Sequence, residues 1–113
     1  MANSSTATLD RSFAAVAHPL RRELLERLAQ RGEMTVGEAT RDFPVSKPAI
    51  SKHLKLLEEA GAIVRVIDGR THRLRLQQRS LEEAYAWLAR QRALWERKLD
   101  VVEEFLNEQE DRA

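Results

Sequence analysis

The longest uninterrupted helix signal lies toward the C-terminal end of the chain, because residues 81–106 contain neither proline nor glycine. Ser80 and Glu83 fit the capping-box pattern at the start of this stretch, so we expect one long terminal helix. Its apolar residues form two adjoining stripes, and a chain of 113 residues has too small a core to cover so wide an arc. Exposed apolar surface of this extent indicates a partner, and we therefore predict a homodimer.

The predicted dimer seam combines the first stripe with one aromatic side chain from the N-terminal part of the chain. It consists of Phe13, Leu81, Tyr85, Leu88, Trp95, Leu99, Val102 and Leu106. The second stripe consists of Trp87, Leu94, Val101 and Phe105. Two tryptophans on an otherwise charged helix favour a subunit seam, but the sequence leaves open which stripe faces the partner.

Two further helices are expected in the first third of the chain. Apolar residues at helical spacing predict a helix that starts at residue 9, and it should stop at His18 because a residue that precedes proline avoids the helical region. Pro19 can open the next helix, which we expect over residues 20–31 and which Gly32 should end. We interpret His18 as a packing or capping residue.

A pair of short helices follows. Thr35 and Glu38 form a capping box for a helix over residues 36–42, and Ser46 can cap a second helix over residues 46–60. Two consecutive short helices joined by a few residues, the second one basic, are typical of a helix-turn-helix.

The predicted helix at residues 46–60 has two chemically different faces. Its apolar residues recur at spacings of three and four and define a face that should be buried: Ala49, Ile50, Leu54, Leu57 and Ala60. The opposite face carries Lys47, Ser51, Lys52 and Lys55. A cationic face on an isolated helix is usually only solvated, so its interpretation depends on the segments around it.

A β-hairpin is expected next. Residues 62–67 are rich in β-branched side chains, residues 71–76 alternate in polarity, and Asp68-Gly69 is the favoured two-residue type I′ turn. Its strands and tip carry Arg65, Arg70, His72, Arg73 and Arg75. This much positive charge suits a wing that contacts a phosphate backbone or a minor groove, although basic residues that only protect a sheet edge stay open as an explanation.

The charges are distributed unevenly along the chain, although its net charge is only +1. Residues 1–40 are neutral overall, residues 41–79 hold nine basic and four acidic side chains for a net charge of +5, and residues 80–113 have a net charge of −4. Such an asymmetry is expected when one surface of a protein meets a polyanion.

The order of these elements resembles that of the ArsR/SmtB family of dimeric winged-helix repressors. The resemblance lies in residues 17–25 (AHPLRRELL), in residues 46–61 (SKPAISKHLKLLEEAG) and in the hairpin tip Asp68-Gly69-Arg70. It implies an α+β, mostly helical fold, a winged helix-turn-helix with long dimerisation helices on the N-terminal side and at the C-terminal end. We accordingly expect a disordered tail at residues 1–8, one domain at residues 9–108 and a disordered tail at residues 109–113.

The resemblance also assigns roles in binding double-stranded DNA. It implies that the residues facing the major groove are Lys47, Pro48, Ser51 and Lys52. The chemistry agrees, because lysine can donate to guanine O6 and N7 and a serine hydroxyl can donate or accept. Contacts to the DNA backbone or from the wing are expected from Ser46, His53, Lys55, Arg65, Arg70 and Arg73. The expected function is a homodimeric repressor that binds a pseudo-palindromic operator through the helix 46–60 and the wing 62–76.

Many members of this family sense metals, but this chain lacks their usual ligands. It has no cysteine, and His18, His53 and His72 lie in three different predicted elements, whereas a metal site needs convergent ligands. We therefore expect neither a metal nor a cofactor, as in the metal-independent branch of the family. The terminal helix resembles that branch at Trp87, Trp95, Arg97, Lys98, Leu99 and Asp100. An effector, whether a small molecule or a protein, is left open.

Other classes of function fit the sequence less well. An enzyme is not expected, because the chain has no known nucleophile or acid–base spacing and no glycine-rich phosphate loop. The alternative is a winged-helix protein-interaction module without specific DNA binding, although such a module has no need of the basic charge on the helix and wing. No apolar run approaches a membrane span and no cysteine marks an oxidising compartment, so we expect a cytoplasmic protein.

Overall fold

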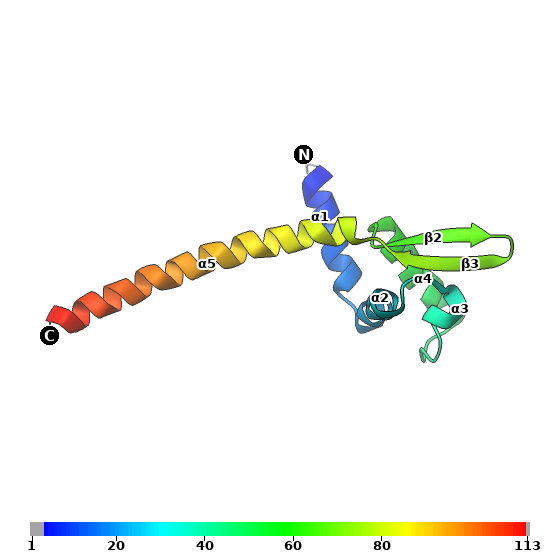
Figure 1. Ribbon diagram of the computed structural model, residues 1–113, viewed down its shortest axis with the longest axis horizontal. Helices are drawn as coiled ribbons and strands as arrows, with labels where there is room; N and C mark the ends of the chain where they lie inside the picture. The colour runs from blue at the N-terminus through cyan, green and yellow to red at the C-terminus, as the bar shows by residue number, and fades with distance from the viewer. Residues whose placement is uncertain (1–3, 113) are drawn as a thin grey trace.

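The computed structural model describes the backbone of residues 4–112 and the side chains of residues 7–79 and 81–111. Its elements (Figure 1) are α1 (Ser4–Val16), α2 (Pro19–Arg31), β1 (Met34–Thr35), α3 (Val36–Ala39), α4 (Lys47–Glu59), β2 (Ile63–Asp68), β3 (Thr71–Leu76) and α5 (Gln78–Arg112). The predicted α+β, mostly helical class is confirmed. The helix pair α3 and α4, followed directly by the hairpin β2–β3, has the order of a winged helix-turn-helix.

The apolar faces of helices α1 to α4 and of the sheet enclose one core. Leu24 and Leu28 of α2, Leu57 of α4 and Leu74 of β3 are fully buried there. The predicted inward face of α4 is confirmed, since Leu54 is also buried and Ile50 packs against the same cluster. The opposite face of α4 is therefore left to the solvent.

Local signals correctly locate both ends of α2. Nδ1 of His18 accepts a hydrogen bond from the backbone N–H of Leu20 at 3.1 Å, so the expected capping role of His18 is confirmed. Pro19 occupies the first turn, where a missing N–H does no harm. At the other end Gly32 has a φ of +80°, and its N–H donates to the carbonyl of Leu28 at 2.8 Å.

The sheet contains a strand that the sequence did not predict. The strand order is β1-β3-β2, and all neighbours are antiparallel. Strand β1 consists of Met34, which pairs with Leu74, and Thr35, which pairs with Arg73. Two residues are too few to show an alternating pattern, and β1 forms because β3 offers it a free edge.

The hairpin turn lies one residue later than predicted. Asp68 pairs with Thr71, so that the two turn residues are Gly69 and Arg70. Gly69 has a φ of +61°, and Arg70 is not among the residues with positive φ. A positive φ at the first turn residue alone is typical of a type II′ turn, so the predicted type I′ turn at Asp68-Gly69 is wrong. The ladder between β2 and β3 extends to Asp68 and displaces the turn.

Both terminal helices are longer than predicted. Helix α1 begins at Ser4 and α5 ends at Arg112, so residues 4–8 and 109–112 are helical and not part of tails; residues 1–3 and 113 lie outside the described residues. No glycine or proline stands there to stop the helices. Helix α5 also starts early, at Gln78, so Ser80 lies inside the helix and the predicted capping box is wrong.

Helix α3 is shorter than predicted and ends at Ala39. The Thr40 hydroxyl donates to the carbonyl of Val36 at 2.7 Å, and Asp42 adopts a φ of +66°, which no α-helical residue has. The start of α3 agrees with the prediction, since Thr35 Oγ1 accepts from the N–H of Glu38 at 3.1 Å and donates to its carboxylate at 2.8 Å. The hydrogen bond from the Thr35 hydroxyl to the carboxylate, followed by one from the Thr35 backbone, is the main cause of a lowered pKa of Glu38.

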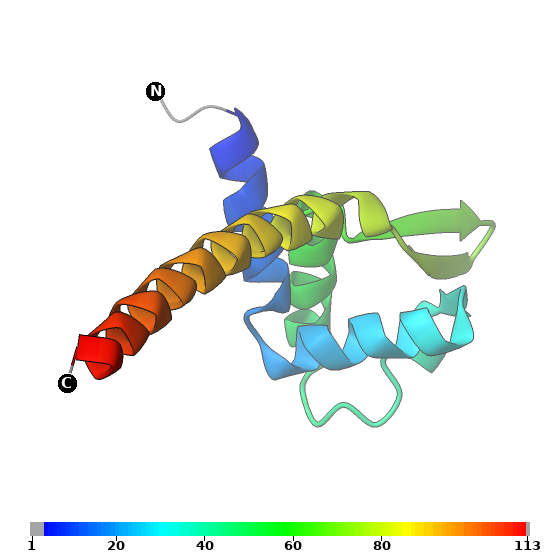
Figure 2. The same ribbon diagram turned by 60° about the vertical axis from the view of Figure 1, so that its left-hand side comes forward.

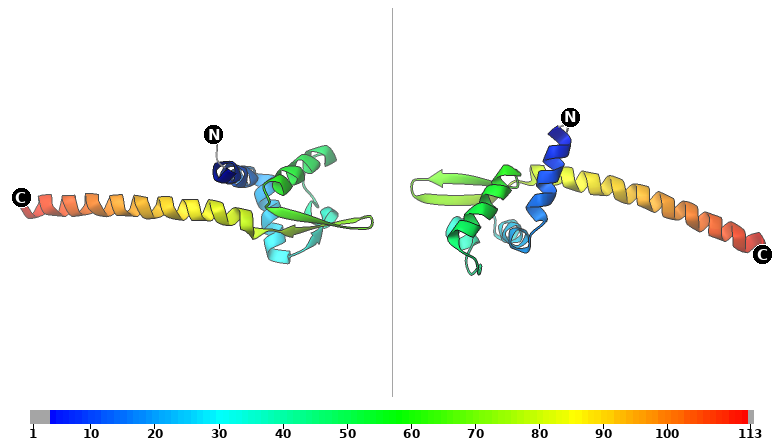
Figure 3. Two further views of the ribbon diagram at one scale, coloured as in Figure 1. Left: turned by 90° about the horizontal axis from the view of Figure 1, so that it is seen from above. Right: turned by 180° about the vertical axis from the view of Figure 1, so that it is seen from behind.

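Helix α5 projects far beyond the rest of the molecule, as Figure 1 and Figure 3 show. Its 35 residues span about 52 Å at 1.5 Å per residue. The radius of gyration is 20.3 Å, whereas a compact chain of this length would have about 13 Å. Only the first turns of α5 meet the body, where α1 crosses them (Figure 2). There the rings of Phe13 and Trp87 pack edge to face, with centroids 5.7 Å apart.

Candidate nucleic-acid interface

Helix α4 is set up locally to present a cationic surface. Ser46 Oγ accepts from the N–H of Ala49 at 3.3 Å, and Pro48 lies in the first turn, where the helix needs no donor. Gly61, with a φ of +71°, follows the helix and turns the chain into β2. The side chains exposed along α4 include all of the predicted groove-facing residues and one further lysine: Lys47, Pro48, Ser51, Lys52 and Lys55.

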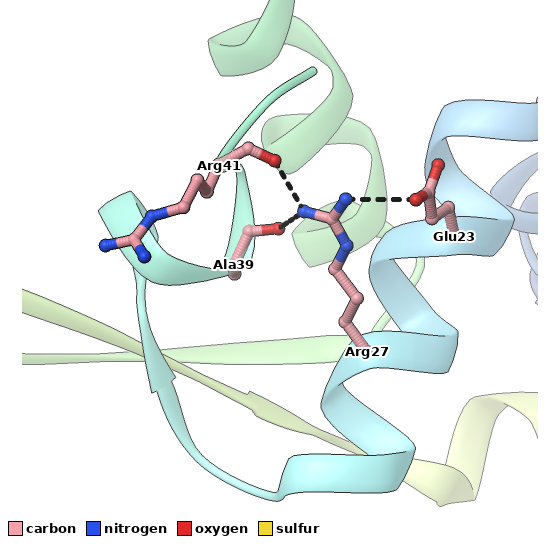
Figure 4. A network of polar contacts seen from close by, with 4 residues as sticks. All are labelled: Glu23, Arg27, Ala39 and Arg41. Carbon is pink, nitrogen blue, oxygen red and sulfur yellow. Dashed lines mark hydrogen bonds and ion pairs between the residues drawn. The ribbon is translucent and has the colours of Figure 1, made fainter.

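One arginine that the sequence analysis missed fixes the connection before α4 (Figure 4). Nη1 of Arg27 donates to the carbonyls of Ala39 at 3.0 Å and Arg41 at 2.8 Å, and Nη2 lies 2.9 Å from Glu23 Oε1. The same guanidinium lies over the Phe43 ring, 4.2 Å from its centroid. Arg27 thus ties the α3–α4 connection to α2. In the sequence, only its spacing of four from Glu23 marks it, and that spacing occurs on many exposed helices.

The arginines of the hairpin fall into two groups. Arg70 at the tip and Arg73 and Arg75 on β3 are exposed, in line with their expected role on the wing surface. Arg65 is different, because its Nε and Nη2 donate to Glu58 Oε1 at 3.0 and 2.6 Å and its Nη1 contacts His72 Nδ1 at 3.2 Å. Arg65 therefore joins the wing to α4, and its side chain is only 26% exposed.

His53 also points away from the exposed face of α4. Its ring is half-buried and lies 4.5 Å, centroid to centroid, from the ring of His18. Nδ1 of His53 is 2.9 Å from Nη1 of Arg21. The structure thus brings together two histidines that the sequence places in different elements. It adds Arg21, which the sequence analysis did not single out.

The residues predicted for the dimer seam lie mostly on the part of α5 that leaves the body. Phe13 and Leu81 are half-buried within the chain, whereas the other six are exposed: Tyr85, Leu88, Trp95, Leu99, Val102 and Leu106. Trp95 is 63% exposed and Val102 is 53% exposed, which are high values for such side chains. The second stripe is exposed as well, with Val101 at 65%.

Among the side chains that the structure describes, no three or more His, Asp or Glu residues gather in a way that could hold a metal ion. No helix in the described part of the chain has both the length and the apolarity needed to cross a membrane.

Comparisons with known proteins identify the family. A helix-turn-helix domain family matches residues 16–66, which include α2, α3, α4 and most of β2. The crystal structure of the ArsR family transcriptional regulator RHA00566 superposes with a TM-score of 0.76 at 36% identity, over 85% of this chain and 97% of that one. The chain belongs to the ArsR family of transcriptional regulators. An ArsR-like transcriptional regulator from Rhodococcus sp. RHA1 agrees, with a TM-score of 0.73 and 31% identity over 91% of this chain and 96% of that one.

Curated relatives match this ArsR-family chain over its helix-turn-helix part. The HTH-type transcriptional regulator Rv2034 of Mycobacterium tuberculosis is 53% identical over 51 residues, which are 45% of this chain and 47% of the relative. The transcriptional repressor SdpR of Bacillus subtilis is 43% identical over 51 residues, which are 45% of this chain and 56% of the relative. The chain thus spans about half the length of these curated relatives.

Proposed function

We propose that this ArsR-family protein is a homodimeric transcriptional repressor that binds a pseudo-palindromic operator in double-stranded DNA. The observation that carries the proposal is the exposed face of α4, which presents Lys47, Ser51 and Lys52 beside a wing that exposes Arg70 and Arg73. The apolar face of the same helix is fixed in the core, so the cationic face is held outward at a defined angle. A solvated helix face would not need the adjoining basic wing.

The exposed residues divide into two roles. Lys47, Pro48, Ser51 and Lys52 lie in the first turns of α4, the part of such a helix that reaches base edges in the major groove. Backbone contacts are proposed for the exposed cations Lys55, Arg70 and Arg73 and for Ser46 at the helix start. Arg65 and His53 have partners inside the chain, and we propose that they position α4 and the wing without touching DNA.

The exposed apolar arc of α5 supports the homodimer. A second copy related by a two-fold axis would cover these side chains and would present two α4 helices to one DNA molecule. The half-site centres would then lie about 10 bp, or a multiple of that distance, apart. Repression would follow from occlusion of the polymerase, and the similarity to the transcriptional repressor SdpR supports this direction of regulation.

The absence of thiol ligands from the sequence favours a metal-independent regulator. Footprinting on the DNA upstream of the protein's own gene, with and without zinc, tests this part of the proposal. We expect one protected site that zinc does not change. Release of the DNA by micromolar zinc would contradict it.

A selection of duplexes from a random library, followed by fluorescence anisotropy, tests the division of roles. Lys52→Ala should reduce the binding free energy by about 1–3 kcal/mol on the selected duplex and by much less on random DNA. Arg70→Ala should weaken binding to the two kinds of DNA equally and reduce the slope of log K against log salt concentration by about one. Lys98→Ala removes an exposed charge from α5 and is the matched control that should change neither. Equal losses on both duplexes for Lys52→Ala and Arg70→Ala would refute the division. Failure to select any duplex would favour the protein-interaction module.

A further inference from the structure

One guanidinium, that of Arg21, joins the three helices α1, α2 and α4. Nη2 of Arg21 donates to the carbonyl of Ala14 at 2.8 Å, and Nε donates to the carbonyls of Ala14 and Ala15 at 3.2 and 3.3 Å, so Arg21 satisfies the C-terminal end of α1. Its remaining nitrogen, Nη1, contacts Nδ1 of His53 on α4 at 2.9 Å. Arg21 itself belongs to α2.

The hydrogen-bond partners of the two histidines show that Nδ1 is the acceptor in both rings. An arginine carries only donors, so Nδ1 of His53 must accept, which requires a neutral ring with its proton on Nε2. Nδ1 of His18 accepts from the backbone N–H of Leu20, which is also only a donor. The two rings lie 4.5 Å apart, centroid to centroid, next to a charged guanidinium.

We propose that Arg21 and His53 form a proton-sensitive latch that positions α4 against α1 and α2 for DNA reading. A neutral His53 closes the latch by accepting from Arg21. A protonated His53 has N–H groups on both nitrogens, loses the hydrogen bond and faces a like charge, so that the latch opens. The latch rests on the proposed DNA-binding function, but its geometry belongs to the free protein.

The charges around His53 all act in the same direction. On α2 the ring faces His18 and Arg21, and on α1 the nearby partners of Arg21 are backbone carbonyls. Within α4 the residues one turn away are Ala49, Ile50, Leu56 and Leu57, none of which is charged. In the described part of the chain, no carboxylate is among the charges that act on the ring.

The pKa of His53 agrees with this geometry. Burial lowers it from the ordinary value of 6.5, and repulsion from a protonated His18 and from Arg21 lowers it further. Because the folded state holds this proton more weakly than the unfolded chain does, the contribution of His53 to stability is intact above about pH 6.5. The contribution is lost as the pH falls through the lowered pKa of the folded state.

The latch also links α4 to the predicted dimer seam. Helix α1, whose end Arg21 holds, packs against α5 through the rings of Phe13 and Trp87. An intact latch therefore keeps α4 in a fixed orientation to α5. In a two-fold dimer this orientation would set the spacing of the two α4 helices on DNA.

The first test needs no DNA. We expect nitrogen-15 NMR of the full-length protein at pH 7.5 to show His53 as the neutral Nε2–H form with Nδ1 as an acceptor. In Arg21→Gln the Nδ1 signal should lose the shift caused by this hydrogen bond. Arg22→Gln is the matched control, because Arg22 also donates to the end of α1, at Val16, but has no contact with His53. A His53 signal that is unchanged by Arg21→Gln would overturn the latch, whatever the protein binds.

The second test measures affinity for the selected duplex between pH 7.5 and 5.5. Over this range we expect the affinity of the wild-type protein to fall about tenfold more than that of His53→Gln. A loss of about tenfold corresponds to the loss of one hydrogen bond to a charged group. Glutamine can still accept from Arg21 but does not titrate, so the affinity of His53→Gln should depend less on pH than that of the wild-type protein. Arg22→Gln, which leaves both His53 and Arg21 in place, should keep the wild-type dependence on pH.

The sign of the pH effect separates the latch from a direct contact with DNA. If His53 touched a phosphate, its protonation would tighten binding at low pH, and His53→Gln would abolish that gain; this result would overturn the proposal. If Arg21→Gln fails to fold, His53→Gln and Arg22→Gln still decide the question. Absence of DNA binding at every pH, together with the expected NMR result, would refute the proposed function and leave the latch intact.

Discussion

The body of the molecule and the projecting part of α5 use the same kinds of side chain in opposite ways. In the body, Leu24, Leu57 and Leu74 are fully buried, and arginines such as Arg27 bind backbone carbonyls of other elements. Beyond Ala84, every described side chain of α5 is exposed, including Trp95. The body therefore covers its own apolar side chains, whereas α5 has an apolar surface without a covering partner in the single chain.

This difference shows that helix formation and burial are separately encoded. A stretch without glycine or proline and with good helix formers makes a helix by local preference. Burial of its apolar arc needs a second surface, and the body is too small to supply one along 35 residues. The effect of a substitution on stability should therefore be independent of protein concentration in the body and should depend on protein concentration in α5.

The largest loss of stability is expected in the body. Leu57→Ala removes a fully buried side chain and should lower the free energy of unfolding by about 2–5 kcal/mol, through lost burial and the cavity left behind. Urea denaturation measures the loss, which should be the same at low and high protein concentration. A loss below 1 kcal/mol would contradict the view that the body is closely packed.

The next largest effect is expected on α5 and on assembly. Trp95→Ala should weaken dimerisation by about 2–4 kcal/mol, since a buried tryptophan is often among the strongest contributors to an interface. Sedimentation over a range of concentrations measures the change, and Asp100→Ala, an exposed polar position on the same helix, is the control. An intact Trp95→Ala dimer of native stability would show that α5 is not the seam.

A smaller effect is expected from the arginine that holds the α3–α4 connection. Arg27→Gln loses two hydrogen bonds to carbonyls, the ion pair with Glu23 and the contact with the Phe43 ring. The free energy of unfolding should fall by about 2 kcal/mol, a value typical of hydrogen bonds from a charged group. Thermal unfolding of the wild-type protein and of Arg27→Gln measures this decrease. A change within experimental error would mean that the connection holds its shape without Arg27.

The smallest effect is expected from the matching arginine on α5. Arg92 pairs with Glu96 at the same spacing of four and at 3.0 Å, but its side chain is 82% exposed, compared with 26% for Arg27. Arg92→Gln should change stability by less than about 0.5 kcal/mol, as is usual for exposed pairs. Thermal unfolding at low and high salt checks this. A loss as large as that of Arg27→Gln would place Arg92 in a buried subunit contact.

Much of the fold could be predicted because its signals act over a few residues. Pro19, the Ser46 cap and Gly61 each act within one turn of their position, and the structure places helix ends at all three. The features that were missed depend on distant parts of the chain. Strand β1 exists only because β3 lies beside it, and the turn moved to Gly69-Arg70 because the ladder of the hairpin extends to Asp68.

The candidate site shows the same division. Lys47, Ser51 and Lys52 could be placed on one exposed face from helical periodicity alone. His53 and Arg65 are cationic or titratable residues in the same segments, yet their partners come from elements that the sequence does not bring together. Spacing along a helix reports the direction of a side chain but not what lies opposite, so these two residues were assigned to the DNA backbone.

The sequence by itself determined the helices, the hairpin and the cationic face of α4, because caps, proline, glycine and periodicity are local properties of the chain. It also determined the apolar arc of α5. Only the tertiary structure decided which charged groups are free and which are held inside, since an arginine or histidine takes its role from the nearest acceptor in space. For this reason Arg21, Arg27 and Arg65 position the elements of the fold, whereas Lys52 and Arg70 remain exposed to the solvent.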